Sequence, residues 1–160
     1  MSDAAINNEK LRLIAALRRE REAFLALLKE VDERRVVYAE SGWRIQDVLS
    51  HLAAWEREAL ATIQAHSEGD EGPRAAPLDG AAFNEAVFAR TQGHFAEQAR
   101  IAWGMARRDL QFAIHEIPAE RFAEEVDYPW GERGSISGLV DALLAHEAEH
   151  MAAVRAVLQG

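Results

Sequence analysis

Apolar side chains recur at intervals of three and four residues along four long stretches of this chain, and no other feature constrains the fold as much. That spacing places the side chains on one face of an α-helix, which must then be buried against another element. The first stretch runs from Ile6 to about Glu33. Its apolar positions are Leu13, Leu17, Phe24, Leu27 and Val31.

The same periodicity predicts a second helix over about residues 44 to 66 and a third over about residues 94 to 117. Pro118 ends the third helix because proline cannot continue one. A shorter helical piece, AAFNEAVFAR, follows Gly80 and precedes the third long helix.

The last long helix begins after an N-cap at Ser135 or Ser137 and runs to about Leu158. Because no stretch alternates polar and apolar residues as a strand does, we expect an all-α four-helix bundle with up-down helices, one long crossover and a short extra helix. The chain is long enough for a single domain over residues 1–160. The acidic, Gly- and Pro-containing stretch at 67–79 is predicted to be a loop within it.

The charge and composition of the chain exclude several classes of function. With 27 acidic against 18 basic residues, the formal charge of −9 repels nucleic acids and anionic membrane surfaces. No cysteine is present, so any metal would be held by histidines and carboxylates. The N-terminus lacks the pattern of a signal peptide and no apolar run approaches the ~20 residues that span a bilayer. We therefore expect a cytoplasmic protein.

Three histidines occupy positions where the buried face of a helix calls for an apolar residue. In the second helix, His51 lies between Val48 and Trp55 on that face. In the last helix, the pair in HEAEH, His146 and His150, replaces two of the expected leucines. The residues along that face are Leu139, Leu143, His146, His150, Ala153 and Val157.

The three histidines match the ligand set of a catalytic metal site. Residues four apart in a helix have Cβ atoms roughly 5 to 6 Å apart, which lets two imidazoles reach one ion. Three protein ligands leave a further position open for water or substrate. In the alternative, each imidazole is a core residue hydrogen-bonded to a carboxylate or carbonyl, because an unpaired buried polar group costs about 1 to 3 kcal/mol.

The letters HEAEH also match the H-E-x-x-H motif of zinc metalloproteases, but the context does not. Those enzymes take a third ligand from further along the chain and align the peptide on a strand edge. Here only MAAVRAVLQG follows His150, without His, Asp or Glu, and the pattern predicts no strand. The third ligand must come from upstream, and a protease is disfavoured.

Two carboxylates beside the histidines are candidate catalytic or supporting residues. Glu147 could act as a general base, or it could pair with Arg155 or a neighbouring helix. Asp47, one turn before His51, could accept the second ring N–H of that histidine. Alternatively, Asp47 favours the helix dipole from the first turn of its helix.

Aromatic residues near these positions have two interpretations. Trp43 and Trp55 could wall a pocket, although a tryptophan on a helix face more often contributes to the core. Tyr128 and Trp130, in the loop before the last helix, are candidates for a lid.

Two blocks of the sequence together resemble a known superfamily. The block GWRIQDVLSHLAAWE, residues 42–56, resembles the second-helix signature of the DinB-like superfamily, and HEAEH resembles its fourth-helix histidine pair. The combination of DVLSHLAAWE, FNEAVFAR and the PW turn is similar to the branch that includes the colibactin self-protection proteins.

This resemblance implies a four-helix bundle, often dimeric, that holds a divalent metal on His51, His146 and His150. Members of the superfamily include thiol-dependent transferases and isomerases. The self-protection branch resembles small hydrolases that open a reactive cyclopropane and need not use metal.

Three functions remain open from the sequence. The first is a metal-dependent enzyme that transforms a small electrophilic molecule by hydrolysis or thiol transfer, with Zn or Ni, or else Fe, as the metal. The second is a metal-free protein that binds or sequesters a small toxic molecule, or a cyclopropane hydrolase. The third is a structural bundle that acts through its outer surface. We expect a small-molecule substrate, no nucleic acid or membrane partner, and a homodimer.

Overall fold

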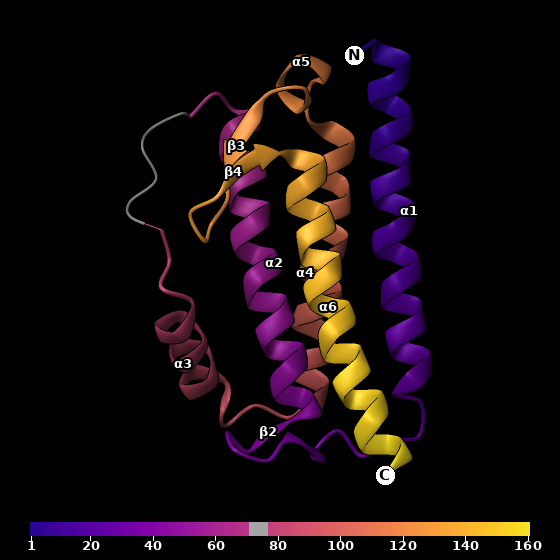
Figure 1. Ribbon diagram of the computed structural model, residues 1–160, viewed down its shortest axis with the longest axis vertical. Helices are drawn as coiled ribbons and strands as arrows, with labels where there is room; N and C mark the ends of the chain where they lie inside the picture. Colours follow the sequence, from indigo (N-terminus) through magenta and orange to yellow (C-terminus); the bar gives the residue numbers. More distant parts are fainter. Residues whose placement is uncertain (71–76) are drawn as a thin grey trace.

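Four long helices form the body of the fold, so the predicted all-α bundle is confirmed (Figure 1). The computed structural model describes residues 1–70 and 77–160. The long helices are α1 (Asp3–Leu27), α2 (Ile45–Ser67), α4 (Ala96–Glu116) and α6 (Ile136–Gln159).

Local interactions set where these helices begin and end. The Ser135 hydroxyl accepts a hydrogen bond from Gly138 N at 3.0 Å, so Ser135 is the N-cap of α6. The first helix ends at Leu27 rather than near Glu33, and this prediction was wrong. Its apolar pattern continues to Val31, but Glu30 has a φ of 65°, in the left-handed region that interrupts an α-helix.

The connection between α2 and α4 is the crossover of the bundle. These two helices run in the same direction, so the intervening chain must return along the length of the molecule (Figure 1). On that return it forms the short helix α3 (Gly80–Thr91), which packs against α2. Of the acidic loop predicted at 67–79, residues 71–76 lie outside the described residues.

Two small hairpins and one helical turn complete the fold, and the hairpins correct the expectation that no strand is present. β1 (Val36–Tyr38) pairs with β2 (Trp43–Arg44), and β3 (Glu125–Asp127) pairs with β4 (Arg133–Ser135), both antiparallel. The turn α5 (Ala119–Phe122) follows α4. Strands of two or three residues are too short to produce a visible alternation. The β1–β2 hairpin lies where α2 begins and α6 ends (Figure 1).

The bundle interior contains two apolar clusters separated along the helices by polar residues. One cluster includes Leu17, Ala59, Leu110 and Leu143, and the other includes Phe24, Leu52, Trp103 and Val154. Near the boundary between the clusters are three buried charged residues, on α2, α4 and α6, and the three histidines of the sequence analysis, on α2 and α6. The buried charged residues are Glu56, Arg107 and Glu147.

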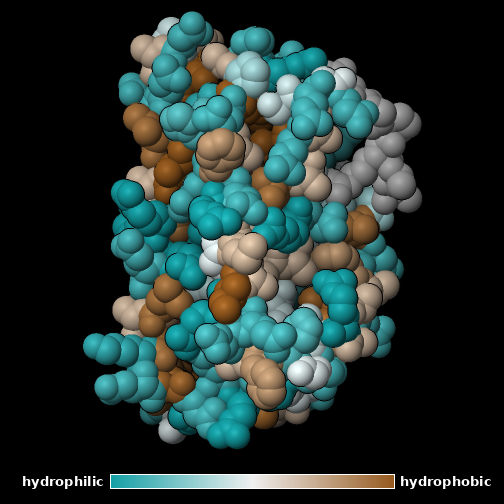
Figure 2. All heavy atoms as spheres, turned by 180° about the vertical axis from the view of Figure 1, so that it is seen from behind, coloured by the Kyte–Doolittle hydropathy of each residue, from teal (hydrophilic) through white to brown (hydrophobic). Residues whose placement is uncertain are grey.

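The face of the molecule seen in Figure 2 carries mixed polar and apolar side chains. Three large apolar side chains of α4 are exposed: Ile101 by 53%, Met105 by 45% and Phe112 by 66%. Their spacing places them on the same, outward face of the helix. Within the described residues, no helix combines the length and apolar character needed to cross a membrane.

Candidate metal centre

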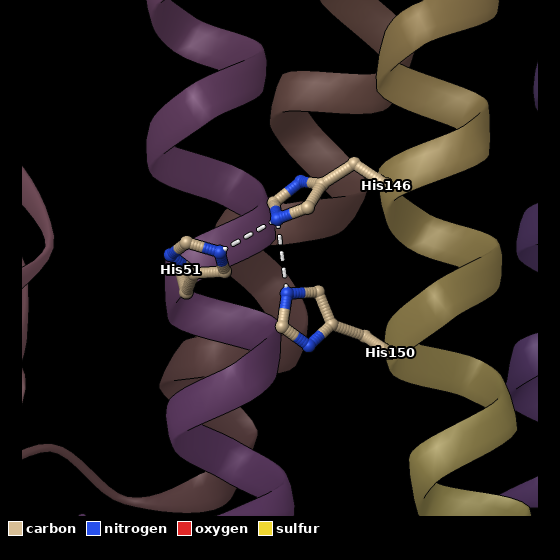
Figure 3. Close-up of side chains that lie close together, drawn as sticks. All are labelled: His51, His146 and His150. Carbon is tan, nitrogen blue, oxygen red and sulfur yellow. Dashed lines mark hydrogen bonds between the residues drawn. The ribbon is translucent and has the colours of Figure 1, made fainter. Parts of the chain in front are cut away.

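The three predicted histidines come together between α2 and α6, near the β1–β2 hairpin. Figure 3 shows the rings of His51, His146 and His150 converging from the two helices. The Nε2 atom of His146 lies 3.0 Å from Nε2 of His51 and 3.0 Å from Nε2 of His150. Among the described residues these form the one group of three His, Cys, Asp or Glu side chains close enough to hold an ion.

The donor set could hold a divalent transition metal, and hydrogen bonds within the cluster do not satisfy all of its nitrogens. A neutral imidazole nitrogen carries either one N–H or one lone pair, so His146 Nε2 cannot make two good hydrogen bonds at once. Within residues 1–70 and 77–160, none of the three Nε2 atoms has a carboxylate or carbonyl partner. Nitrogen ligands of a tetrahedral zinc ion, bound at 2.0 to 2.1 Å, lie roughly 3.3 Å apart. The observed separations are close to this value.

The surroundings keep the histidines neutral, which is the form that binds metal. Burial, together with the neighbouring rings of His146 and His150, lowers the pKa of His51 to about 3. The pKa of His150 falls to about 4 for the same two reasons, burial and the His146 ring. Burial also lowers the pKa of His146, although Glu149 acts in the opposite direction.

Tyr38 is a supporting residue that the sequence analysis missed. Its hydroxyl lies 2.7 Å from Nδ1 of His150, on the side of the ring away from the cluster. Such a contact fixes the orientation and tautomer of a metal-binding histidine. Tyr38 comes from β1, far from HEAEH in the sequence, and no local pattern connects the two.

Asp47 does not support His51, and that prediction was wrong. Its carboxylate accepts hydrogen bonds from the backbone N and the guanidinium of Arg44, at 2.8 to 3.0 Å, and so caps the start of α2. Nδ1 of His51 is buried and has no hydrogen-bond partner among the described residues. The Asn84 side chain slightly raises the pKa of His51, but its carbonyl oxygen is aligned with the Trp55 indole N–H, at 2.9 Å.

Glu147 points away from the histidines, so its predicted role as a general base is contradicted. Its Oε2 accepts a hydrogen bond from the Arg107 guanidinium at 3.0 Å, and Arg107 also donates to Glu56 and to the Leu17 carbonyl. All three charged side chains are nearly inaccessible, at 2% to 3% exposure. The partner of Glu147 is thus Arg107 on the neighbouring helix α4, and not Arg155. Burial raises the pKa of Glu147 to about 7, and Arg107 opposes that shift.

A comparison with protein families places the chain. The model of the DinB superfamily matches residues 16–154, which include all three histidines and most of the four long helices. The chain belongs to the DinB superfamily. Comparisons with curated proteins and with solved structures find no match.

In this DinB-superfamily protein, an open pocket of about 400 Å³ adjoins the histidines. Two of its lining residues touch them: Tyr38 through the contact with His150, and Trp43, whose ring centroid is 5.1 Å from that of His51. The remaining lining residues come from the β1–β2 turn and from α3. They are Glu40, Ser41, Ala81, Asn84, Glu85 and Phe88.

The candidate aromatic residues of this DinB-superfamily protein have different surroundings. Trp43 lines the pocket, as one interpretation of the sequence allowed. Trp55 is buried in the core, 6.2 Å between ring centroids from Trp130. Tyr128 is also buried and donates its hydroxyl hydrogen to the Ser135 carbonyl at 2.7 Å. Because neither Tyr128 nor Trp130 lines the pocket beside the histidines, the prediction that they form its lid was wrong.

Proposed function

We propose that this protein is a metal-dependent enzyme that transforms a small electrophilic molecule at His51, His146 and His150. The observation that carries the proposal is the convergence of three Nε2 atoms, with two separations of 3.0 Å and no other acceptor among the described residues. Buried polar groups in native proteins usually have hydrogen-bond partners. A shared cation would satisfy all three nitrogens at once.

The ligand set suits Zn or Ni, and also Fe, because imidazole binds each of these ions. Three protein ligands leave a position open, and an ion there would act as a Lewis acid that activates water or polarises a substrate oxygen. His51 arrives on a different helix from His146 and His150, so the bundle itself keeps the three donors in place.

The chain's own residues provide orientation and access. Tyr38 holds the His150 ring through Nδ1, which leaves Nε2 directed at the centre of the cluster. Burial keeps the three imidazoles unprotonated at neutral pH, because their pKa values are all lowered. A pocket that could hold a small molecule lies next to the cluster, and Tyr38 and Trp43 line this pocket and contact His150 and His51.

Elemental analysis of protein purified without an affinity tag or chelator tests the proposal. We expect about one equivalent of a transition metal per chain in the wild type and little in a His146→Ala, His150→Ala double variant. A His115→Ala variant is the matched control, because that histidine is exposed on α4 and pairs with Glu116. Metal-free wild type whose melting temperature does not respond to added Zn or Ni would refute the proposal.

Incubation with candidate small electrophiles then separates an enzyme from a binding protein. Product in excess of protein, detected by mass spectrometry and lost in the double variant, supports turnover at the histidines. A stoichiometric adduct would instead favour the sequestering role of a self-protection protein. Turnover by metal-free protein would favour a hydrolase of the cyclopropane-opening kind.

A further inference from the structure

The pocket beside the histidines carries a chemical bias that the metal centre alone does not explain. Its inner wall is aromatic, because Trp43 and Phe88 stack with ring centroids 5.7 Å apart and an interplanar angle of 13°. Neither side chain belongs to the fully buried core. A stacked pair at the edge of a pocket offers a flat apolar surface to a ligand ring.

Among the described residues that line the pocket, the charged side chains are two carboxylates, with no Lys or Arg. Glu40 comes from the β1–β2 turn and Glu85 from α3. Both are exposed, and neither makes a hydrogen bond or ion pair within the described residues. The entrance therefore has a negative potential in a chain whose net charge is already −9.

A buried polar atom lies behind the aromatic wall. His51 is 4% exposed, and its Nδ1 has no hydrogen-bond partner in the described part of the chain. In Figure 3 this nitrogen lies on the side of the ring turned away from His146 and His150. The ring centroids of Trp43 and His51 are 5.1 Å apart in an edge-to-face arrangement. The pocket wall is therefore in direct contact with the histidine cluster.

We propose that this pocket receives the substrate of the histidine centre and selects neutral or cationic molecules with an aromatic or other flat apolar part. Carboxylate-bearing molecules, including thiol cosubstrates that carry carboxylates, meet repulsion from Glu40 and Glu85. This inference rests on the proposed function for its link to chemistry. The binding preference itself depends only on the pocket.

A matched series of probes tests the preference in metal-free and zinc-loaded protein. The probes share a phenyl ring and differ in charge: 2-phenylethylamine, 2-phenylethanol and 3-phenylpropionate. Dissociation constants are measured by NMR titration at low ionic strength. We expect the amine to bind about tenfold more tightly than the carboxylate, with the alcohol between them, because each carboxylate of the pocket contributes a modest Coulomb energy near the surface.

Two kinds of variant connect the preference to the pocket. The Glu40→Gln, Glu85→Gln double variant should bind the amine and the carboxylate within a factor of about two of each other. A Glu22→Gln, Glu120→Gln variant changes the net charge equally but alters no lining residue, and should keep the wild-type preference. Trp43→Ala should weaken all three probes, and Phe88→Ala, a half-buried position on α3, repeats the test if Trp43→Ala fails to fold.

The outcomes separate this inference from the proposed function. Carboxylate binding as tight as amine binding, or no binding of any probe, would overturn the inference even if the protein contains metal. Charge-selective binding that the pocket variants abolish would support it even if elemental analysis finds no metal, and only the proposed function would then fail.

Discussion

Two polar groups, one fully buried and one with two half-buried members, lie at neighbouring levels of the same bundle and satisfy their polar atoms in different ways. Glu56, Arg107 and Glu147 form an ion network in which a guanidinium donates to two carboxylates and a backbone carbonyl. His51, His146 and His150 have mainly one another and the Tyr38 hydroxyl. His146 and Glu147 are adjacent in the sequence but belong to different groups.

This comparison distinguishes buried polar residues that partners within the protein satisfy from polar residues that suit a bound ligand. The ion network is nearly complete without one, since donors and acceptors of opposite charge face each other and both ends are inaccessible. The histidine cluster brings like groups together and stands beside an open pocket. Buried polarity with complementary partners is structural, whereas buried polarity without them indicates a binding site.

The largest expected effect is loss of the ion network. Arg107→Met leaves two buried carboxylates unpaired, and we expect the free energy of unfolding to fall by about 3 to 5 kcal/mol. Urea denaturation measures it. The control is Arg57→Met, which removes an exposed ion pair with Asp109 and should cost less than about 1 kcal/mol. Equal costs for the two variants would mean that the network is not structural.

Zinc should stabilise the wild type by binding to the histidine cluster. At a free zinc concentration about 100 times the dissociation constant, the gain is about 2.7 kcal/mol. A His146→Ala variant should lose this gain, since the Nε2 of His146 contacts both other histidines. Glu147→Gln should keep it, although the variant starts from a different stability. Loss of the zinc response in Glu147→Gln would contradict the separation of the two groups.

Removal of the Tyr38 hydroxyl should weaken the metal centre without unfolding the protein. Tyr38→Phe frees Nδ1 of His150, and we expect zinc affinity to drop about 10- to 100-fold, the usual effect of losing such a supporting partner. Competition with a chelator of known affinity measures it. Tyr128→Phe is the matched control because its hydroxyl donates to the Ser135 carbonyl and not to a histidine. Asp47→Asn should also leave zinc affinity unchanged.

The smallest effect expected for a single residue is the pH dependence of metal-free protein. The folded-state pKa values of His51 and His150, about 3 and 4, lie below the ordinary value of 6.5. The unfolded chain therefore binds more protons than the folded chain below about pH 6.5. The free energy of unfolding decreases as the pH is lowered. Between pH 7 and 5.5 we expect a loss of about 1 kcal/mol for each buried histidine.

A variant with all three histidines changed to Leu isolates this effect from Glu147. The pKa of Glu147 is raised to about 7, so Glu147 affects the pH dependence in the opposite direction. Its contribution to the free energy of unfolding decreases as the pH rises from 4.5 to 7. The difference in unfolding free energy between wild type and the triple variant removes that term. A difference that does not change with pH would show that the histidines are not shielded from protonation.

Helix periodicity was sufficient to predict the long helices and the three histidines that meet, because a repeat of 3.6 residues determines which side chains share a buried face. Periodicity could not predict what lies opposite each residue. That depends on how helices pack, and so the partner of Glu147 proved to be Arg107 on α4 rather than a metal-bound group.

The fold class, the family motifs and the candidate ligands can be predicted from the sequence alone, because they depend on local spacing and residue type. The surroundings of each residue depend on tertiary packing. Tyr38 reaches His150 across 112 positions, and α3 folds back to form one side of the pocket. Such contacts join distant segments through packing, which local propensity does not encode.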